Sequence, residues 1–256
     1  FVGCTGAYNV PERAIPQATA SVFNKLGLDF GILGESELCC GSTAMRLGDI
    51  EAFQRIAESN LEMFRKLHDE KGMKTIVTSC AGCYRAILKD YSKADAYGRM
   101  MEGIRVTHIT QFLHDLFTSG QLKLSKPVDW KVTYHDSCNI SRGVGLLEEP
   151  RYILRNVCNE FYEMPEKTIR ERTFCCGSGA GLGSDENMEM RLRGGFPRAN
   201  AVKYVREQYG VNLLSCICAI DKATLPPLLE YWVPGVEVAG VHELVGNALV
   251  VRGEKE

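Results

Sequence analysis

"ELCCGSTAMRLGD" (37–49) and "TFCCGSGAGLGSD" (173–185) carry the same tetrapeptide, Cys-Cys-Gly-Ser, at 39–42 and again at 175–178. The sequence around the first copy recurs around the second at an offset of about 134 to 136 residues. Cys4 in "VGCTG" matches Cys138 in "HDSCN", and Cys80 in "VTSCAGC" matches Cys216 in "LLSCIC". Such a repeat indicates two similar half-domains related by a pseudo-two-fold axis. We expect them at 1–124 and 125–256, with the polar stretch 120–130 as the linker.

Each half alternates short apolar runs with amphipathic stretches. The expected strands are 1–3, 29–34, 75–79, 104–109, 131–136, 160–164, 212–215 and 236–240. The expected helices are 11–27, 44–69, 82–90, 111–117, 148–157, 185–208, 222–232 and 242–250. This alternation predicts an α/β fold of two Rossmann-like half-domains with short parallel sheets. Every cysteine cluster follows an expected strand, and the carboxyl ends of parallel strands meet at one edge, so the clusters are expected to converge there.

The composition excludes several classes of protein. The chain has 256 residues, 45% of them hydrophobic and 24% charged, which is enough apolar material for a sizeable core. A net charge of −2 and a pI near 6.3 give no basic excess for binding nucleic acid. No apolar run approaches the roughly 18 to 20 residues of a membrane span, and no signal peptide is present. Because the chain begins directly in a strand-like run without an initiator Met, we expect that the start of a longer polypeptide is missing.

Eleven cysteines without an export signal favour metal ligation or redox chemistry over disulfides. Adjacent Cα atoms lie about 3.8 Å apart, whereas disulfides need roughly 4.4–6.8 Å, so a Cys-Cys pair suits one metal centre better than a mutual disulfide. The first half offers five thiols: Cys4, Cys39, Cys40, Cys80 and Cys83. Structural zinc takes four ligands, while the several irons of an iron–sulfur cluster fit five thiols better. Because the spacing differs from that of ferredoxins, we expect a cluster other than an ordinary cube.

The second half departs from this pattern at its end. Its first three thiols are Cys138, Cys175 and Cys176, but the final pair reads Cys216-Ile-Cys218. When "CAI" is aligned with "CAG", Cys218 takes the first place of C-x-x-C and Asp221 replaces the second. When the internal repeat is followed, Cys216 takes the first place. Both alignments remain open, and this set would hold a variant cluster, an oxygen-ligated iron or another metal.

The cysteine pattern resembles the CCG domain of heterodisulfide reductase and its relatives over essentially the whole chain. Within that family the motifs are most similar to the DsrK type of subunit. The stretches that carry the resemblance are "CCGSTAMRLGD" (39–49), "IVTSCAGC" (76–83), "VTYHDSCN" (132–139), "FCCGSGAGL" (174–182), "MRLRGGFPRANAVK" (190–203) and "ICAIDKATL" (217–225). The resemblance implies a noncubane [4Fe-4S] cluster on the first five cysteines. It implies a second cofactor site on Cys138, Cys175, Cys176, Cys216 and Cys218.

The resemblance also implies an activity and its setting. A cluster of this kind splits a disulfide or trisulfide into thiols by one-electron steps, with the five cysteines of the first set as the catalytic ligands. The implied partners are a DsrM-like membrane cytochrome b subunit, a small DsrC-like sulfur carrier and other iron–sulfur modules, at the cytoplasmic face of the inner membrane. Relatives carry ferredoxin-like clusters ahead of the first CCG unit, and this chain has no such cysteine run. Two alternatives remain: the iron–sulfur subunit of a flavin-linked lactate or glycolate oxidase, and a metal-bearing interaction module without turnover.

Several other residues favour structural roles. Cys158 has no counterpart in the first half and is interpreted as a buried core thiol. For His135-Asp136, satisfying backbone groups is favoured over donating a proton to a leaving thiolate. The glycines of 177–183 lack the G-x-G-x-x-G spacing, so they indicate close packing around a cluster. The stripe at 47–67 predicts core packing. A partner surface and solvated helix faces explain the arginines about equally well; these are Arg46, Arg191, Arg193 and Arg198.

Overall fold

The computed structural model of the protein describes residues 1–124, 128–179 and 181–249, apart from the side chain of Pro11. Its strands form two sheets in which every pair is parallel. The smaller sheet joins β1 (Thr75–Thr78) and β2 (Arg105–His108). The larger sheet has the order β4-β3-β5-β6, with bounds Cys158–Phe161, Val128–Tyr134, Leu213–Cys216 and Glu237–Gly240. The predicted α/β class with short parallel sheets is confirmed.

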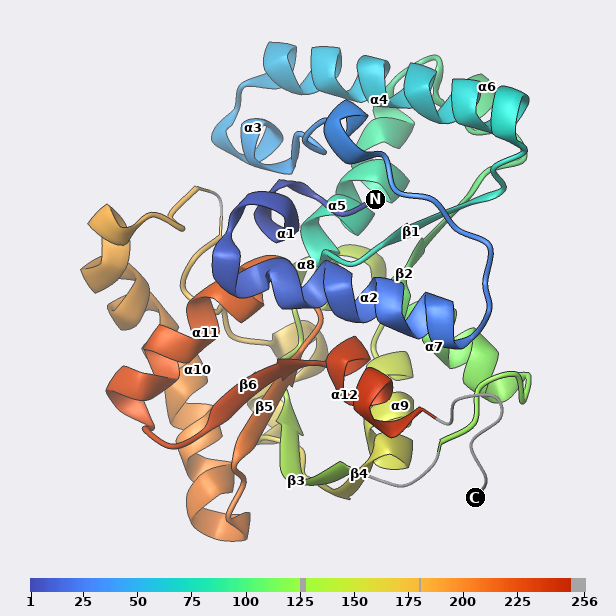
Figure 1. Cartoon of the computed structure of the whole chain (residues 1–256). Helices are drawn as coiled ribbons and strands as arrows, with labels where there is room; N and C mark the ends of the chain where they lie inside the picture. Colours follow the sequence, from blue (N-terminus) through green and yellow to red (C-terminus); the bar gives the residue numbers. More distant parts are fainter. Residues whose placement is uncertain (125–127, 180, 250–256) are drawn as a thin grey trace.

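Helices surround both sheets (Figure 1). The first half contains α1 (Cys4–Tyr8), α2 (Ala14–Lys25), α3 (Ser42–Leu47), α4 (Ile50–Lys71), α5 (Ala81–Arg85), α6 (Tyr97–Met100) and α7 (Ile109–Thr118). The second contains α8 (Cys138–Val144), α9 (Glu149–Val157), α10 (Met188–Tyr209), α11 (Ala219–Trp232) and α12 (Val241–Ala248). Short 3-10 turns lie at Val10–Arg13, Gly34–Ser36, Tyr91–Lys93, Glu166–Thr168, Arg170–Arg172 and Asp185–Asn187, and a π turn at Ala86–Asp90. Within the described residues, no helix is both long and apolar enough to span a membrane.

Two of the expected strands are absent. Residues 29–34 form no strand, and Ile32 in their middle is 70% exposed, so pairing would bury little apolar surface there. Residues 1–3 also form no strand, although the amino group of Phe1 donates to the carbonyl oxygen of Val77 in β1 at 2.9 Å. The first half is therefore a two-stranded unit, while all four strands expected in the second half are present.

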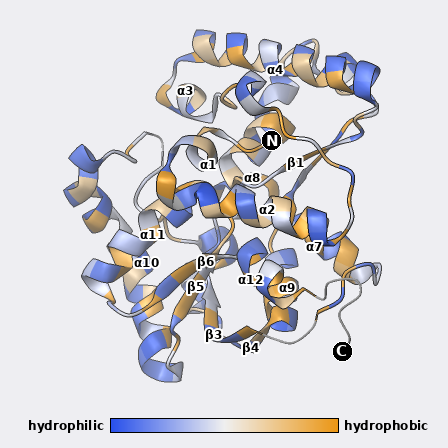
Figure 2. Ribbon diagram, in the orientation of Figure 1, coloured by the Kyte–Doolittle hydropathy of each residue, from blue (hydrophilic) through white to orange (hydrophobic). Residues whose placement is uncertain are grey.

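The long helix expected at 44–69 is two helices. Gly48 adopts a left-handed conformation with φ of +86°, which ends α3. The carboxylate of Asp49 then accepts a hydrogen bond from the backbone N–H of Ala52 at 3.0 Å and caps α4. The apolar stripe predicted at 47–67 is buried at Phe53 and Phe64, and the alternation of polar and apolar residues along α4 is visible in Figure 2. The prediction is wrong at the start of the stripe, where Leu47 and Ile50 are exposed. Because of this break, the short helix α3, which follows the Cys39-Cys40 pair, is not a continuation of α4.

Other segments differ from the sequence-based expectations at their ends. Helices α1 and α8, each of which begins on a cysteine, were not predicted, because they are too short to show a helical period. The expected linker 120–130 includes residues 125–127, which lie outside the described part of the chain, and its last three residues belong to β3. The helix expected at 242–250 ends at Ala248, and position 250 lies outside the described residues.

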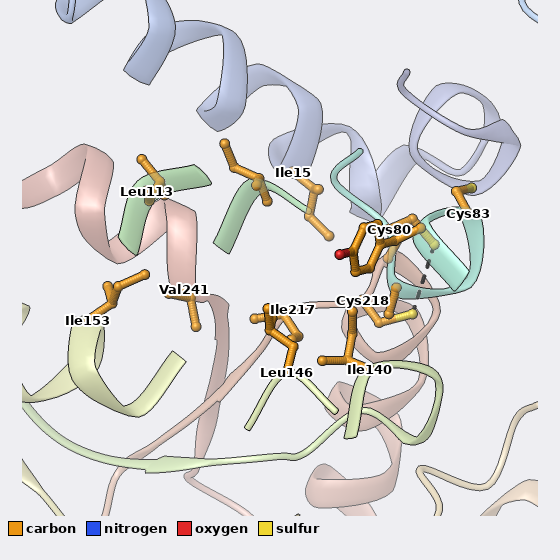
Figure 3. Packing of buried hydrophobic residues seen from close by; sticks show 14 of the residues in the cluster. Ile15, Cys80, Cys83, Leu113, Ile140, Leu146, Ile153, Ile217, Cys218 and Val241 are labelled. Carbon is orange, nitrogen blue, oxygen red and sulfur yellow. Dashed lines mark hydrogen bonds between the residues drawn. The ribbon is translucent and has the colours of Figure 1, made fainter. Parts of the chain in front are cut away.

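One hydrophobic cluster spans both halves. Helix α2 packs against α12, and α7 packs against α9, so each contact joins a first-half helix to a second-half helix. Ile15, Leu113, Ile153, Ile217 and Val241 meet there, fully or almost fully buried (Figure 3). Burying each side chain of this size contributes about 1.5–3 kcal/mol. The two halves are therefore held together by a shared core, which fixes their cysteine loops relative to each other.

Two buried histidines make the stability of this core depend on pH. Burial is the main cause that lowers the pKa of His108 to about 3 and that of His242 to about 4. An unfolded histidine takes up a proton near pH 6.5, whereas the native state binds it only at much lower pH. The folded pKa is below the unfolded one, so the stabilisation is complete above about pH 6.5 and decreases as the pH falls towards 4.

Replacing His242 with phenylalanine is expected to weaken this dependence. Between pH 7.5 and pH 5.5, one such histidine lowers the free energy of unfolding by on the order of 1 kcal/mol. The thermal unfolding midpoint of His242→Phe should therefore fall less between pH 7.5 and 5.5 than that of the wild type. His114→Gln, at a half-buried histidine, serves as the control. An equal fall in wild type and His242→Phe would contradict the prediction.

Candidate metal centre

Nine of the eleven cysteines line one cavity of about 310 Å³. They are Cys4, Cys39, Cys40, Cys80, Cys83, Cys138, Cys175, Cys176 and Cys218. The cavity lies beyond the carboxyl ends of β1, β3 and β5, where the sequence analysis expected the clusters to converge. Among the described residues, no three Cys, His, Asp or Glu side chains are arranged to hold a single metal ion. The thiols instead surround a space large enough for a group of atoms.

Cys4 is brought to the cavity by a loop that needs glycine. Gly3 has φ of +81°, and a Cβ at this position would lie 2.9 Å from the sulfur of Cys83. The backbone N–H of Gly3 donates to the carboxylate of Glu37 at 2.6 Å, which ties this loop to the one that carries Cys39. The sulfur atoms of Cys4 and Cys39 are consequently 3.9 Å apart. Both of these cysteines are exposed, so they mark the open side of the first set.

The Cys39-Cys40 pair is held by its carbonyl groups. The amide of Asn60 donates to the carbonyl oxygen of Cys39 at 2.9 Å, and the hydroxyl of Tyr91 donates to that of Cys40 at 2.9 Å. Asn60 also donates to the Tyr91 hydroxyl at 2.9 Å. The sequence analysis did not single out these two residues. The signal for Asn60 was a polar side chain on the apolar face of α4, where it is fully buried.

Cys80 and Cys83 lie at the deep end of the cavity. Cys80 follows β1 and is the N-cap of α5, and Cys83 is the third residue of that helix. The sulfur of Cys80 is 3.9 Å from that of Cys218, which comes from the other half (Figure 3). Hydrogen bonds from Cys218 and then Cys83 hold the pKa of Cys80 well below its ordinary value, and bonds from Cys39 and Cys83 do the same for Cys40. Thiolates are the form in which cysteine binds metal, so the interior favours ligation at these two positions.

The second set is arranged similarly. Cys138 begins α8 after β3, while Cys175 and Cys176 follow the loop after β4. A hydrogen bond from the Cys176 thiol, with backbone N–H groups of Gly177 and Gly179, lowers the pKa of Cys175 to about 5. Gly177 has φ of +96°, and a Cβ there would collide with a backbone carbonyl oxygen of α10. Close backbone packing against α10 explains this glycine, whereas a Cβ at Gly179 would meet no atom within 4 Å, so the packing expected of the loop glycines around a cluster stays a prediction. Ala180 within the loop lies outside the described residues.

Asp136 fixes the loop that leads to Cys175. Both of its carboxylate oxygens accept hydrogen bonds from the fully buried guanidinium of Arg151, at 2.7 and 2.8 Å. Arg151 also donates to Glu163 at 2.7 Å. The backbone N–H of Arg170 donates to the Asp136 carboxylate at 2.8 Å, and the hydroxyl of Thr173 donates to the Asp136 carbonyl at 2.7 Å. Asp136 is therefore structural. The favoured interpretation is not borne out for its neighbour His135, because Nδ1 of that side chain is buried without a hydrogen-bond partner among the described residues and Nε2 lies 3.5 Å from Oδ1 of Asp221.

The four arginines considered in the sequence analysis have different roles. Arg198 is fully buried and donates to backbone and side-chain oxygens of the loop 168–174. Arg191 is almost buried and donates to the backbone of 183–184. Both side chains stabilise internal loops, so the two interpretations considered for them, a partner surface and a solvated helix face, are wrong. Arg193 is exposed and pairs with Glu189. Arg46 lines the cavity and donates to the side chain of Asn139 at 2.7 Å.

Two cysteines stay away from the cavity. Cys216 is the last residue of β5 and is fully buried, and burial raises its pKa above the ordinary value. The cavity lining includes Cys218 and does not include Cys216. The structure therefore brings Cys218, and not Cys216, to the other thiols. Cys158 lies in β4 within the core, where burial raises its pKa to about 12, as expected for a core thiol.

A parallel α/β fold that gathers cysteines from two repeated halves around one cavity defines a duplicated cysteine-rich, metal-binding class of protein. The model of the CCG family, described as a cysteine-rich domain, matches residues 1–87 and again 132–219. The chain belongs to the CCG family. The two matches fall on the two halves, which confirms the family and the duplication that the sequence motifs predicted.

Curated relatives add three comparisons. The chain is 52% identical over 152 residues to the Hdr-like menaquinol oxidoreductase iron-sulfur subunit 2 of Archaeoglobus fulgidus, which covers 58% of this chain and 27% of that protein. It is 34% identical over 258 residues to one of the subunits of dihydromethanophenazine:CoB--CoM heterodisulfide reductase of Methanosarcina barkeri. That match covers 97% of this chain and 58% of that subunit. It is 35% identical over 181 residues to the EtfAB:quinone oxidoreductase of Syntrophomonas wolfei. That match covers 71% of this chain and 24% of that protein. The chain thus spans between a quarter and three fifths of these relatives' lengths.

Proposed function

We propose that the chain is the CCG portion of a heterodisulfide-reductase-like, iron–sulfur electron-transfer subunit that acts on an S–S bond. The observation that carries this proposal is the convergence of Cys4, Cys39, Cys40, Cys80 and Cys83 on one cavity. Their donor set is soft, and it exceeds the four thiolates of an ordinary cube by one. Five thiols around a multi-atom space support a noncubane [4Fe-4S] cluster. The relatives named as iron–sulfur subunits and as a heterodisulfide reductase support the same assignment.

The reaction takes two electrons and two protons per S–S bond, which breaks to give two thiols. A bound iron–sulfur cluster supplies the one-electron steps. The chain's own residues divide the remaining tasks. Cys40 and Cys80, with lowered pKa values, provide buried thiolates at the deep side. Cys4 and Cys39 are exposed, so a sulfur compound would enter from their side.

The setting follows from the relatives' names. A relative named as a menaquinol oxidoreductase subunit supports exchange of electrons with a quinol pool through partner subunits. We infer a DsrK-like role in dissimilatory sulfur metabolism, with a DsrM-like cytochrome b, a DsrC-like carrier and other iron–sulfur modules as partners, at the cytoplasmic face of a membrane. We also infer functional halves at 1–124 and 125–256, which the two family matches support.

A second candidate is electron transfer from a flavoprotein to a quinone without an S–S substrate. The relative named EtfAB:quinone oxidoreductase favours it, because its match covers 71% of this chain. The iron–sulfur subunit of a flavin-linked lactate or glycolate oxidase belongs to the same type of reaction.

Electron paramagnetic resonance of the anaerobically purified full-length protein tests the proposal. We expect iron and acid-labile sulfide in the protein, a paramagnetic signal that changes when a thiol is added, and reduction of disulfides with reduced viologen as donor. A signal that is unaffected by thiols, together with rapid oxidation of a reduced flavoprotein, would favour the second candidate. Zinc without turnover would support a metal-bearing interaction module instead.

A further inference from the structure

The long helices α4 and α10 are equivalent parts of the two halves. Each has 22 residues and ends at a glycine in the left-handed conformation. The fourth residue is Phe53 in α4 and Arg191 in α10, and the eleventh is Asn60 in α4 and Arg198 in α10. All four residues are buried. The second half therefore has two buried arginines where the first half has a phenyl ring and an amide.

The fourth position of each helix contacts the loop of a Cys-Cys pair. A Cβ on Gly41, which follows the first pair, would lie 3.0 Å from the ring of Phe53. A Cβ on Gly177, which follows the second pair, would meet the backbone of Arg191. The two helices therefore present equivalent faces to the two cysteine loops.

The eleventh position of each helix donates hydrogen bonds to the same loops. The amide of Asn60 donates to the carbonyl oxygen of Cys39 at 2.9 Å. The guanidinium of Arg198 donates to the hydroxyl of Thr173 at 2.8 Å and to the carbonyl oxygen of Phe174 at 3.5 Å, just before the second pair. The support is similar in both halves, but it is neutral in the first and positively charged in the second.

No neighbouring carboxylate neutralises the charge of Arg198. The side chain is fully buried, and no carboxylate oxygen of the described residues lies within 4.0 Å of it. Arg151, which is also fully buried, is in contrast paired with Asp136 and Glu163. Burial lowers the pKa of Arg198 to about 10, so its guanidinium stays protonated at neutral pH. Because a buried cation without a counter-charge costs free energy, Arg198 points to an anionic group in the adjacent cysteine loop.

Arg191 adds a second buried positive charge. Its Nε atom is buried and has no acceptor among the described residues, and the carboxylate of Asp185, 4.0 Å away, is 99% exposed. The arginines that line the cavity itself come from both halves and are exposed or half-buried, so water screens their charges; these are Arg46, Arg85 and Arg142. The buried guanidiniums on α10 therefore distinguish the surroundings of the second set of cysteines from those of the first.

We propose that Arg198 and Arg191 are the counter-cations of the second set of cysteines and raise the reduction potential of the metal centre on that set. One-electron reduction makes such a centre more negative by one unit, so a buried positive charge nearby favours the reduced form. An S–S bond needs two electrons, and a centre with a raised potential can hold the first until the second arrives. This inference goes beyond the proposed function, which depends on the first set.

Redox titration of the anaerobically purified full-length protein, followed by electron paramagnetic resonance, measures the potential of each centre. The signals are assigned with Cys80→Ser and Cys175→Ser, each of which removes one thiol from one set. Arg198→Gln keeps hydrogen-bond donors but loses the charge. It is expected to lower the equilibrium constant for reduction of the second centre at least about tenfold, which is about 59 mV for a one-electron couple.

Three further variants separate the charge from a structural role. Arg191→Gln should lower the potential of the second centre in the same direction, and it provides the measurement if Arg198→Gln does not fold. Arg198→Lys keeps the charge and should keep the potential close to that of the wild type. Arg193→Gln is the matched control, because Arg193 lies on the same helix, is 77% exposed and pairs with Glu189. It should leave both potentials unchanged.

A lower potential in the two glutamine variants, restored in Arg198→Lys and confined to the second centre, supports the inference. A merely structural role would reduce the metal content without moving the potential of the centres that remain. Unchanged potentials in Arg198→Gln and Arg191→Gln, an equal shift in Arg193→Gln, or a second set without a redox-active centre would overturn it. The thiol-dependent signal of the first centre tests the proposed function separately, so the failure of one is distinguishable from the failure of the other.

Discussion

Replacing Cys80 with serine is expected to remove the first cluster and to lower the rate of S–S reduction at least about 100-fold, since changes to outer partners of a metal already cost about 10–100-fold. Of the proposed ligands, Cys80 has the most support from its surroundings. It is buried at the end of β1, and thiols on both sides, Cys218 and Cys83, hold its pKa well below the ordinary value. A serine hydroxyl keeps the size of the side chain but does not ionise to an anionic ligand near neutral pH.

The measurement is iron content together with the viologen-dependent rate of disulfide reduction. Cys158→Ser is the control, because Cys158 is a buried cysteine of the core that lies away from the cavity. Loss of iron and activity in Cys80→Ser with both retained in Cys158→Ser separates ligation from a general sensitivity to cysteine replacement. Full iron content and full activity in Cys80→Ser would remove the basis of the proposed function.

Most of the site was predictable because its chemistry depends on residue types that are rare and repeated. The Cys-Cys pairs, the C-x-x-C and the match between Cys4 and Cys138 identified eight of the nine thiols that line the cavity, and the alignment on "CAI" offered the ninth, Cys218, as one of two alternatives. The choice between Cys216 and Cys218 was not predictable, because it depends on where β5 ends. The strand continues through Cys216, whose side chain stays in the core, and the N-cap position falls on Cys218.

The predictions of the fold that were wrong concern segments whose local sequence gives only a weak indication of their structure. Residues 29–34 have the composition of a strand, yet no neighbouring strand covers them and Ile32 remains exposed. The break between α3 and α4 depends on the left-handed conformation of Gly48. The spacing of apolar residues in the sequence continues across Gly48, so it gives no sign of this break. The hydrogen bond from Tyr91 to the cysteine loop comes from a residue 51 positions away from Cys40, and no sequence spacing indicates such a contact.

Replacing Arg151 with methionine is expected to destabilise the protein by about 3–5 kcal/mol, the usual cost of removing one partner from a buried ion pair. The Arg151 side chain is fully buried and Asp136 is 1% exposed, so the variant leaves a carboxylate in the interior without its cation. Methionine fills much of the vacated volume, which limits the contribution of a cavity. The loop to Cys175 also depends on Asp136, so any metal binding by the second set of cysteines should weaken as well.

Chemical denaturation followed by circular dichroism measures the change in the free energy of unfolding. Arg155→Met is the matched control, because Arg155 lies 3.5 Å from the same Glu163 but its side chain is 52% exposed. An exposed pair contributes about 0–1 kcal/mol, so this variant should stay close to the wild type. Combining Arg151→Met with Asp136→Asn removes the unpaired charge and should restore part of the loss, since the asparagine oxygen still accepts from the backbone N–H of Arg170. Equal stabilities of Arg151→Met and Arg155→Met would show that the buried pair does not hold this loop.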